Sequence, residues 1–292
     1  MNAAPLTPST LRHRSLRFHW RAGLAVVFGT MAGAAALIGA LFVGDSMRAS
    51  LREQALARLG PVDYAVDGGR FFGEALAERF AADGELKQVI EHVCPLVTLR
   101  ASVTNASGDA RVNGIQALGV DERFWRMFGD DEVTPDGRTV ILNQPLADSL
   151  GVRAGDDVLL RLPKPGAAPL ETLLGRRDDT IASLRLTIAK IIPANGAGAF
   201  ALRPQQAVAQ NAFVPLATMQ RALGQAGRVN AMLAVAKVER DRPSDLHETF
   251  SKRLDAAVTL VDLNLSIRVS DTLGYAAVES TNLLVEPQAE DA

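Results

Sequence analysis

Gly44, Asp45 and Ser46 directly follow a long apolar run and are the residues whose setting most suggests chemistry. A serine can act as an esterase nucleophile when it ends a short buried strand and a distant aspartate and histidine activate it. The apolar run has 22 residues, which is too long for a strand, and the candidate partners Asp245 and His247 are separated by one residue where this chemistry needs two. We therefore interpret the triplet as a helix junction and keep an esterase that uses Ser46 as a third hypothesis.

The other residue types that could do chemistry lack the necessary spacing. His92 and His247 lie far apart and belong to no H-x-x-x-H pattern, and the single cysteine, Cys94, excludes a multi-cysteine zinc site. The chain has no G-x-x-x-x-G-K-[ST] loop, so it cannot itself be a P-loop ATPase, and Asn195–Gly198 lacks the third glycine of a dinucleotide-binding loop. We predict that the chain is not an enzyme and holds no catalytic residue, metal or cofactor, and that Cys94 is a buried small hydrophobe.

The composition that surrounds these residues is uneven along the chain. The 292 residues carry 31 basic and 33 acidic side chains, a balance that gives no basic field for nucleic acid. The first 44 residues contain four arginines and no acidic residue, so the rest of the chain holds all 33 acidic residues and the other 27 basic ones. With 48% hydrophobic residues, the chain can bury a sizeable core.

Residues 22–43 form a run of 22 residues without a charge. A helix of this length is about 33 Å long and can cross a hydrocarbon core of roughly 30 Å. Because the arginines precede the run, the positive-inside rule predicts a cytoplasmic basic arm over residues 1–21, and residues 44–292 outside the membrane. The alternative is a cleavable signal peptide, whose apolar core is usually shorter, about 7–15 residues.

The apolar run is rich in small residues, which a lone anchor does not need. Eleven of its 22 residues are alanine or glycine, and Gly29 with Gly33 forms a G-x-x-x-G pair. Ala36 and Ala40 continue small residues at four-residue spacing. Such residues let helix backbones approach closely in a membrane, so we predict that this helix packs against other membrane helices.

Beyond the run, Leu51, Ala55 and Leu59 recur at helical spacing until Gly60 and Pro61, which predicts a stalk helix over residues 44–60 with a cap at Asp45 or Ser46. Residues 61–292 predict an α+β region of mixed elements, with one domain or two subdomains as the alternatives. The predicted strands are Val62–Val66, Val93–Val103, Arg111–Val120, Thr139–Leu142, Val158–Leu162, Leu184–Ile192, Val229–Val238 and Asn282–Val285. The predicted helices are Phe71–Ala82, a short helix capped by Asp121, Gln144–Leu150, Leu216–Leu223 and Ser244–Ala257. Residues 163–179 read as a boundary or an exposed insertion, and Asn195–Gly198 as a flexible loop.

Three stretches of the sequence together resemble an ABC transporter permease of the FtsX/MacB/LolE-like type. Ser15-Leu16-Arg17, the Gly/Ala-rich run and the string GALFVGDSMRASLR (39–52) resemble the start of such a permease. VILNQPLADSLGVRAGD (140–156) and NAFVPLATMQRAL (211–223), the latter followed by Arg228-Val229-Asn230, are similar to its MacB-like periplasmic core domain. The resemblance covers nearly all of the chain, with the motifs in the family's order.

The resemblance implies an inner-membrane protein whose residues 61–292 form a MacB-like periplasmic core domain. It implies partners: a separate cytoplasmic ABC ATPase subunit, and other permease helices or a second permease copy. It also implies at least three further spans, whereas this sequence has no second apolar run of 18 residues. We therefore expect an N-terminal portion, a truncated gene product, or a module that works with a separately encoded remainder.

Two main hypotheses follow for function. The first is a permease-like subunit of an ABC transport or mechanotransmission system, with a periplasmic domain that relays motion driven by the ATPase. The second is a single-pass, membrane-anchored binding or sensor module without a transport partner. The residues that carry the first hypothesis are Gly29, Gly33, Ala36 and Ala40 for helix packing, and Gly44, Asp45 and Ser46 for the junction of span and stalk.

Overall fold

The structure is a computed structural model that describes residues 8–129, 135, 137–165, 180–203, 207–237, 243–263, 265–270 and 275–280. The chain divides into two compact units, Met1–Gln54 and Ala55–Ala292. The predicted strand Asn282–Val285 and most of the predicted insertion at 163–179 lie outside the described residues.

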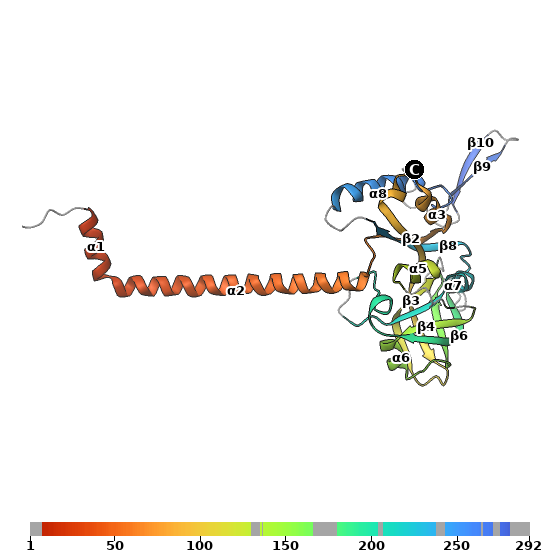
Figure 1. The fold of residues 1–292 in the computed structure, drawn as a ribbon, viewed down its shortest axis with the longest axis horizontal. Helices are drawn as coiled ribbons and strands as arrows, with labels where there is room; N and C mark the ends of the chain where they lie inside the picture. Colours follow the sequence, from red (N-terminus) through yellow and green to blue (C-terminus); the bar gives the residue numbers. More distant parts are fainter. Residues whose placement is uncertain are drawn as a thin grey trace, which may run out of the picture. The chain divides into compact units, whose positions relative to one another are not determined.

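Two helices make up the N-terminal part of the chain (Figure 1). Helix α1 spans Pro8–Phe18 and helix α2 spans Trp20–Leu59, with a bend at His19 between them. Helix α2 has 40 residues, and neither helix buries a side chain. One described helix, α2, is long and apolar enough to cross a membrane.

The second unit is a β domain with helices on its surface. Its strands are β1 (Tyr64–Gly73), β2 (Ile90–Asn105), β3 (Arg111–Val120), β4 (Thr139–Asn143), β5 (Asp157–Pro163), β6 (Ile181–Ile192), β7 (Asn211–Pro215), β8 (Arg228–Ala236), β9 (Leu265–Ser270) and β10 (Tyr275–Ser280). Its helices are α3 (Ala75–Ala82), α4 (Leu86–Val89), α5 (Glu122–Met127), α6 (Gln144–Leu150), the 3-10 turn η2 (Gly196–Ala199), α7 (Leu216–Leu223) and α8 (Pro243–Ala257).

Six strands close on themselves to form a small barrel. Their order is β2-β3-β7-β4-β6-β5, and β5 pairs back to β2. The β3–β7 and β4–β6 pairs are parallel, whereas the others are antiparallel. Apolar side chains that alternate along the strands fill the interior, among them Val103, Ile115, Leu160 and Leu186.

Strand β2 belongs to both the barrel and a second, three-stranded sheet. Its first half, Ile90–Leu96, pairs with β8, which in turn pairs with β1. Its second half pairs with β3, and its last residues also pair with β5. Helices α3 and α8 contribute to a core on one face of the β1-β8-β2 sheet, where the Phe80 and Phe250 rings lie 4.8 Å apart.

The side chain of Asn230 fills the place where β2 passes from one partner to the next. Strands β8 and β5 lie along the same edge of β2. Strand β8 pairs with β2 as far as Leu96, and β5 pairs with it from Ser102 onward. Between them, Asn230 Oδ1 accepts a hydrogen bond of 2.8 Å from the Thr98 backbone N–H, and its Nδ2 donates one of 2.8 Å to the Thr98 carbonyl. The amide therefore supplies at Thr98 both bonds that a neighbouring strand would make.

The structure confirms the predicted α+β class with a long apolar helix ahead of the domain. It also confirms the helices at Gln144–Leu150 and Leu216–Leu223 and the strand at Arg111–Val120. Asp121 caps α5 as predicted, because its side chain accepts from the Arg123 N–H. The hairpin of β9 and β10 was not predicted.

Three predictions are wrong in detail. Phe71 and Phe72 belong to strand β1, because both rings are buried in the core that β8 shares, and α3 begins only at Ala75. Helix α2 passes through Asp45 and Ser46 without a new start, since one interior glycine, Gly44, costs only about 1 kcal/mol. The segment Asn195–Gly198 is a packed turn rather than a flexible loop, with Gly198 buried.

Replacing Asn230 with alanine should destabilise the domain by about 1–3 kcal/mol, because the Thr98 backbone groups lose both partners. Urea unfolding of the full chain in detergent measures this change. Asn113→Ala is the matched control, since exposed Asn113 accepts one hydrogen bond from Arg111. Equal losses in the two variants would show that Asn230 does not replace a strand.

Candidate functional site

The predicted packing residues lie along one narrow line of helix α2. At 100° per residue, Gly29, Gly33, Ala36 and Ala40 fall within about 60° of one another around the helix axis. A Cβ placed on Gly29 or Gly33 would meet nothing within 4 Å, and all four residues are exposed. The line is therefore open to close approach by another helix, as its composition suggested.

Gly44, Asp45 and Ser46 lie in the interior of α2 rather than at a helix boundary. The carboxylate of Asp45 lies 3.7 Å from the Arg48 guanidinium, and both side chains are exposed. Such a surface ion pair contributes little to stability. Ser46 also lacks the strand-to-helix turn that presents an esterase nucleophile, so its position gives the third hypothesis no support.

A short joint connects the end of α2 to the β domain, and sequence reasoning did not identify it. Gly60 ends the helix at φ +63°, and Val62 is buried two residues later. The backbone N–H of Asp63 donates to the Ala234 carbonyl at 3.1 Å, and its carboxylate accepts from the Ala236 N–H at 2.9 Å. Three residues after the helix ends, the chain is therefore fixed to strand β8.

A second connection joins the last turn of α2 to the barrel. The Ala201 N–H donates a hydrogen bond of 3.2 Å to the Arg58 carbonyl, which is one of the carbonyls left without a partner at a helix end. A Cβ on Gly60 would lie 2.6 Å from the Phe128 ring, which contacts Phe200 edge to face with 5.9 Å between ring centroids. The end of α2 is thus held at the segment that follows η2.

Two buried asparagines hold this segment in place. The Nδ2 of Asn143 donates to the carbonyls of Gly198 and Ala209, at 2.9 and 2.6 Å, while its Oδ1 accepts from the Leu146 and Asn211 N–H groups. The Nδ2 of Asn211 donates to the carbonyls of Gly198 and Phe200, at 3.2 and 2.8 Å. Buried polar groups arranged in this way specify one conformation of the backbone that they contact.

These asparagines lie in the two stretches that carried the family resemblance, but their role was missed. Asn143 directly follows the apolar strand Thr139–Leu142, and Asn211 precedes the apolar residues Ala212–Val214. An asparagine at the end of a buried strand could have indicated this role, because a buried amide needs several hydrogen-bond partners.

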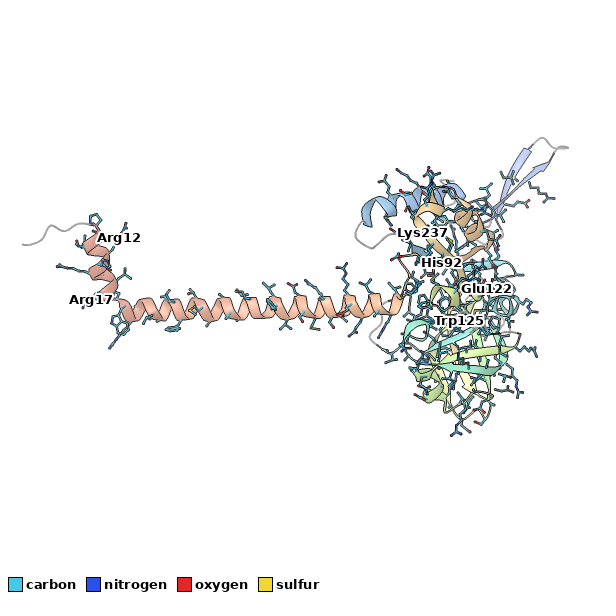
Figure 2. The ribbon with its side chains drawn as sticks, viewed as in Figure 1. Arg12, Arg17, His92, Glu122, Trp125 and Lys237 are labelled. Atoms are coloured by element: carbon cyan, nitrogen blue, oxygen red, sulfur yellow. The ribbon has the colours of Figure 1, made fainter. Side chains whose placement is uncertain are left out.

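An aromatic cluster lies beside the joint. Phe124, Trp125, Phe200 and Phe213 are fully buried, with ring centroids 5.1–5.7 Å apart along the chain of contacts. Trp125 lies in the body of the domain in Figure 2. The aromatic residues of α5 therefore serve packing, and the cluster gives the joint a rigid support.

Arg123 crosslinks three elements next to this cluster. Its guanidinium contacts the carboxylates of Asp121 and Glu74, and Gln220 donates to the other oxygen of Glu74 at 3.0 Å. Partial burial lowers the pKa of Arg123, but the hydrogen bonds and charges of Asp121 and Glu74 outweigh burial and raise it overall. The arginine therefore stays charged and ties α5 to the start of α3 and to α7.

A polar cleft lies on the outer face of the β2–β3 ladder. Its volume is about 540 Å³. Strands β1, β2, β3 and β8 and the segment before β7 line it, and its charged side chains are Asp67, Arg100 and Arg203. Arg203 pairs with Asp67 at 2.9 Å.

No group of three or more His, Cys, Asp or Glu side chains within the described ranges is placed to hold a metal ion. Cys94 is fully buried on β2, which confirms its predicted setting, and burial raises the pKa of its thiol. His247 lies exposed on α8.

A model of one protein family, described as the MacB-like periplasmic core domain, matches residues 24–246. The chain belongs to this family. The matched region begins inside the apolar helix α2 and ends in α8, so it includes the joint, the barrel and both asparagines. Proteins with a MacB-like core domain are permease components of ABC-type transporters.

Solved structures with MacB-like folds have low identity to this chain. The periplasmic region of MacB from Actinobacillus actinomycetemcomitans is 11% identical, with a TM-score of 0.39 over 63% of this chain and 73% of that one. The extracellular domain of the ABC-type transporter YknZ is 11% identical, with a TM-score of 0.38 over 63% of this chain and 80% of that one. A permease domain from Porphyromonas gingivalis is 12% identical, with a TM-score of 0.38 over 75% of this chain and 88% of that one. No curated protein sequence matches the chain.

A left-handed backbone conformation costs a residue with a Cβ roughly 1–2 kcal/mol. Replacing Gly60 with alanine should destabilise the joint by more than this amount. The added methyl would also meet Phe128. Gly69→Ala is the matched control, because Gly69 has φ +62° and open space around it. Urea unfolding of both variants measures the difference, and equal losses would mean that the Phe128 contact is unimportant.

The ionisation of Cys94 alone should lower the free energy of unfolding by about 1.4 kcal/mol per pH unit above about pH 8.5, which is the ordinary pKa of a thiol. In this range the thiol of the unfolded chain ionises, while the raised pKa keeps the buried thiol protonated, so the unfolded state is favoured. Urea unfolding at several pH values, compared with Cys94→Ala, isolates this slope. A variant with the same slope as the parent protein would contradict the prediction.

Proposed function

We propose that this chain is a permease-type subunit of an ABC transport or mechanotransmission system. In this proposal α2 crosses the inner membrane with its N-terminus in the cytoplasm, and the β domain lies outside. A separate cytoplasmic ATPase drives motion of the membrane helices, and the domain relays it. The observation that carries the proposal is the family match, which runs without a break from the apolar helix into the barrel.

The continuity of α2 supports a mechanical role. Residues 22–43 account for about 33 Å of the helix, and residues 44–59 add about 24 Å at 1.5 Å per residue. No loop interrupts the helix between the apolar segment and the joint. Because a continuous helix resists bending much more than a loop does, a shift of its apolar part displaces Leu59 as well.

The contacts of the joint pass such a displacement to the domain. Asp63 holds β8 with two hydrogen bonds, and Arg58 accepts one from Ala201. The two asparagines connect Ala201's neighbour Phe200 to β4 and β7. Motion of the helix end therefore reaches both the three-stranded sheet and the barrel.

The second candidate is a membrane-anchored binding module, and the polar cleft on the β2–β3 face favours it. Side chains with charge and hydrogen-bonding groups around a concavity are typical of a small polar ligand site. In this case α2 would serve only as an anchor and would not need the line of small residues at Gly29 and Gly33.

Replacing Gly29 and Gly33 with leucine should abolish co-purification with a co-expressed ABC ATPase subunit and permease helices, because leucine side chains block close helix approach. Ala34→Leu is the matched control, since Ala34 lies about 140° around the helix from Gly29. Purification in mild detergent followed by mass spectrometry gives the readout. If the double variant retains its partners, or the parent chain recruits none, the anchored module is the better interpretation.

A further inference from the structure

Helix α1 is the element that the proposed function leaves without a role. It spans Pro8–Phe18 and carries Arg12, Arg14 and Arg17, of which Arg12 and Arg17 are labelled in Figure 2. Arg21 follows at the start of α2, and no acidic residue occurs before Asp45. Over these residues the chain therefore presents positive charge without internal compensation.

The length of α1 indicates that it needs a surface to fold on. It has 11 residues and buries no side chain. Isolated helices shorter than about 12–15 residues are marginal in water, because nucleation costs more than a few turns recover. Hydrogen bonds through His19 join α1 to α2 at one end, so a surface that contacts one face of α1 would add the stability that its short length does not supply.

The distribution of side chains around α1 shows what kind of surface would fit. At 100° per residue, Leu11 and Phe18 lie within about 20° of each other around the axis. They are 54% and 82% exposed. Arg14 and Arg17 lie on one side of this apolar line and Arg12 on the other, while Leu16 lies on the other face, about 140° from Leu11. Apolar residues flanked by arginines are typical of helices that lie in a membrane interface.

The residues at the bend are of the types that proteins place at the level of the lipid headgroups. Phe18 and His19 contact edge to face at 4.8 Å, and the Arg21 guanidinium lies 5.6 Å from the centre of the Trp20 ring. Aromatic rings with a polar tip concentrate at the membrane–water boundary. The bend at His19, directly after α1, lets the helix turn away from the direction of α2 (Figure 1).

We propose that α1 lies along the cytoplasmic surface of the membrane and binds the phosphate groups of anionic lipids through Arg12, Arg14 and Arg17. Leu11 and Phe18 insert between the headgroups, and guanidinium groups bind phosphate oxygens with two parallel hydrogen bonds. The side of the membrane rests on the proposed function, whereas the lipid binding does not. A protein partner fits less well, because α1 directly precedes the apolar helix α2 in the sequence and so lies close to any membrane that α2 crosses.

Hydrogen exchange of the α1 amides in the full chain tests this proposal. The chain is reconstituted in vesicles of phosphatidylcholine, or of phosphatidylcholine mixed with phosphatidylglycerol. Each arginine near an anionic surface contributes roughly a fivefold preference, so the three together should favour the bound helix by about 100-fold. We expect slow exchange of α1 only with phosphatidylglycerol, and its loss at high salt.

The triple variant R12Q/R14Q/R17Q should lose this protection, whereas R48Q/R52Q, which changes exposed arginines beyond the apolar segment, should keep it. Equal protection in both kinds of vesicle would overturn the proposal, and so would protection that appears only when an ATPase subunit is added. Free inorganic phosphate that reproduced the effect without anionic lipid would overturn it too.

Lipid binding by α1 and the orientation of the chain in the membrane are tested independently. Both leaflets of these vesicles have the same composition, so α1 meets anionic lipid whichever way the chain inserts. Orientation is measured in cells, with an impermeant thiol reagent and an Ala3→Cys variant in which buried Cys94 stays unreactive. Labelling from outside the cell would contradict the proposed function and the cytoplasmic position of α1, but not its binding to anionic lipid.

Discussion

Strand β2 has to pair with two sheets at once, and the arrangement of the domain follows from this constraint. Its first half extends the β1-β8 pair, while its second half closes the barrel between β3 and β5. A strand cannot change partners along one edge without leaving backbone groups unpaired, and here the Asn230 amide supplies the missing partner at Thr98. The two sheets therefore move as one body, since any shear between them must break hydrogen bonds along a single strand.

The joint at the end of α2 uses the same device on a smaller scale. Side-chain amides and carboxylates replace strand or helix partners at Asp63, Asn143 and Asn211, and each one connects segments that are far apart in the sequence. Among the described residues, none in this region is placed to carry out a reaction. Its polar groups fix the geometry of the backbone, which the proposed mechanical role requires.

Much of the fold could be predicted, because local signals were strong where elements were regular. The cap at Asp121 and the end of the long helix before Gly60 followed from capping chemistry. The remaining features depend on contacts across the sequence. Phe71 and Phe72 have a helical setting in the sequence but belong to β1, where Phe72 pairs with Val229 of β8, and the distant Asn143 and Asn211 help to order η2. The joint could not be predicted for the same reason, whereas the apolar helix and its small residues were visible directly.

The pairing of β1 with β8 has a consequence for how the domain is made. β1 follows the apolar helix directly, yet its strand partner lies more than 150 residues later, as in the pair Tyr64↔Ala234. During synthesis β1 emerges first and has to wait, unpaired and with both phenylalanines exposed, until β8 has been made. Pairings this distant in sequence form slowly, and exposed apolar strands aggregate while they wait. The sheet that directly follows α2 in the sequence is therefore the last part of the domain to become structured, and a factor that shields β1 would determine the yield of folded protein.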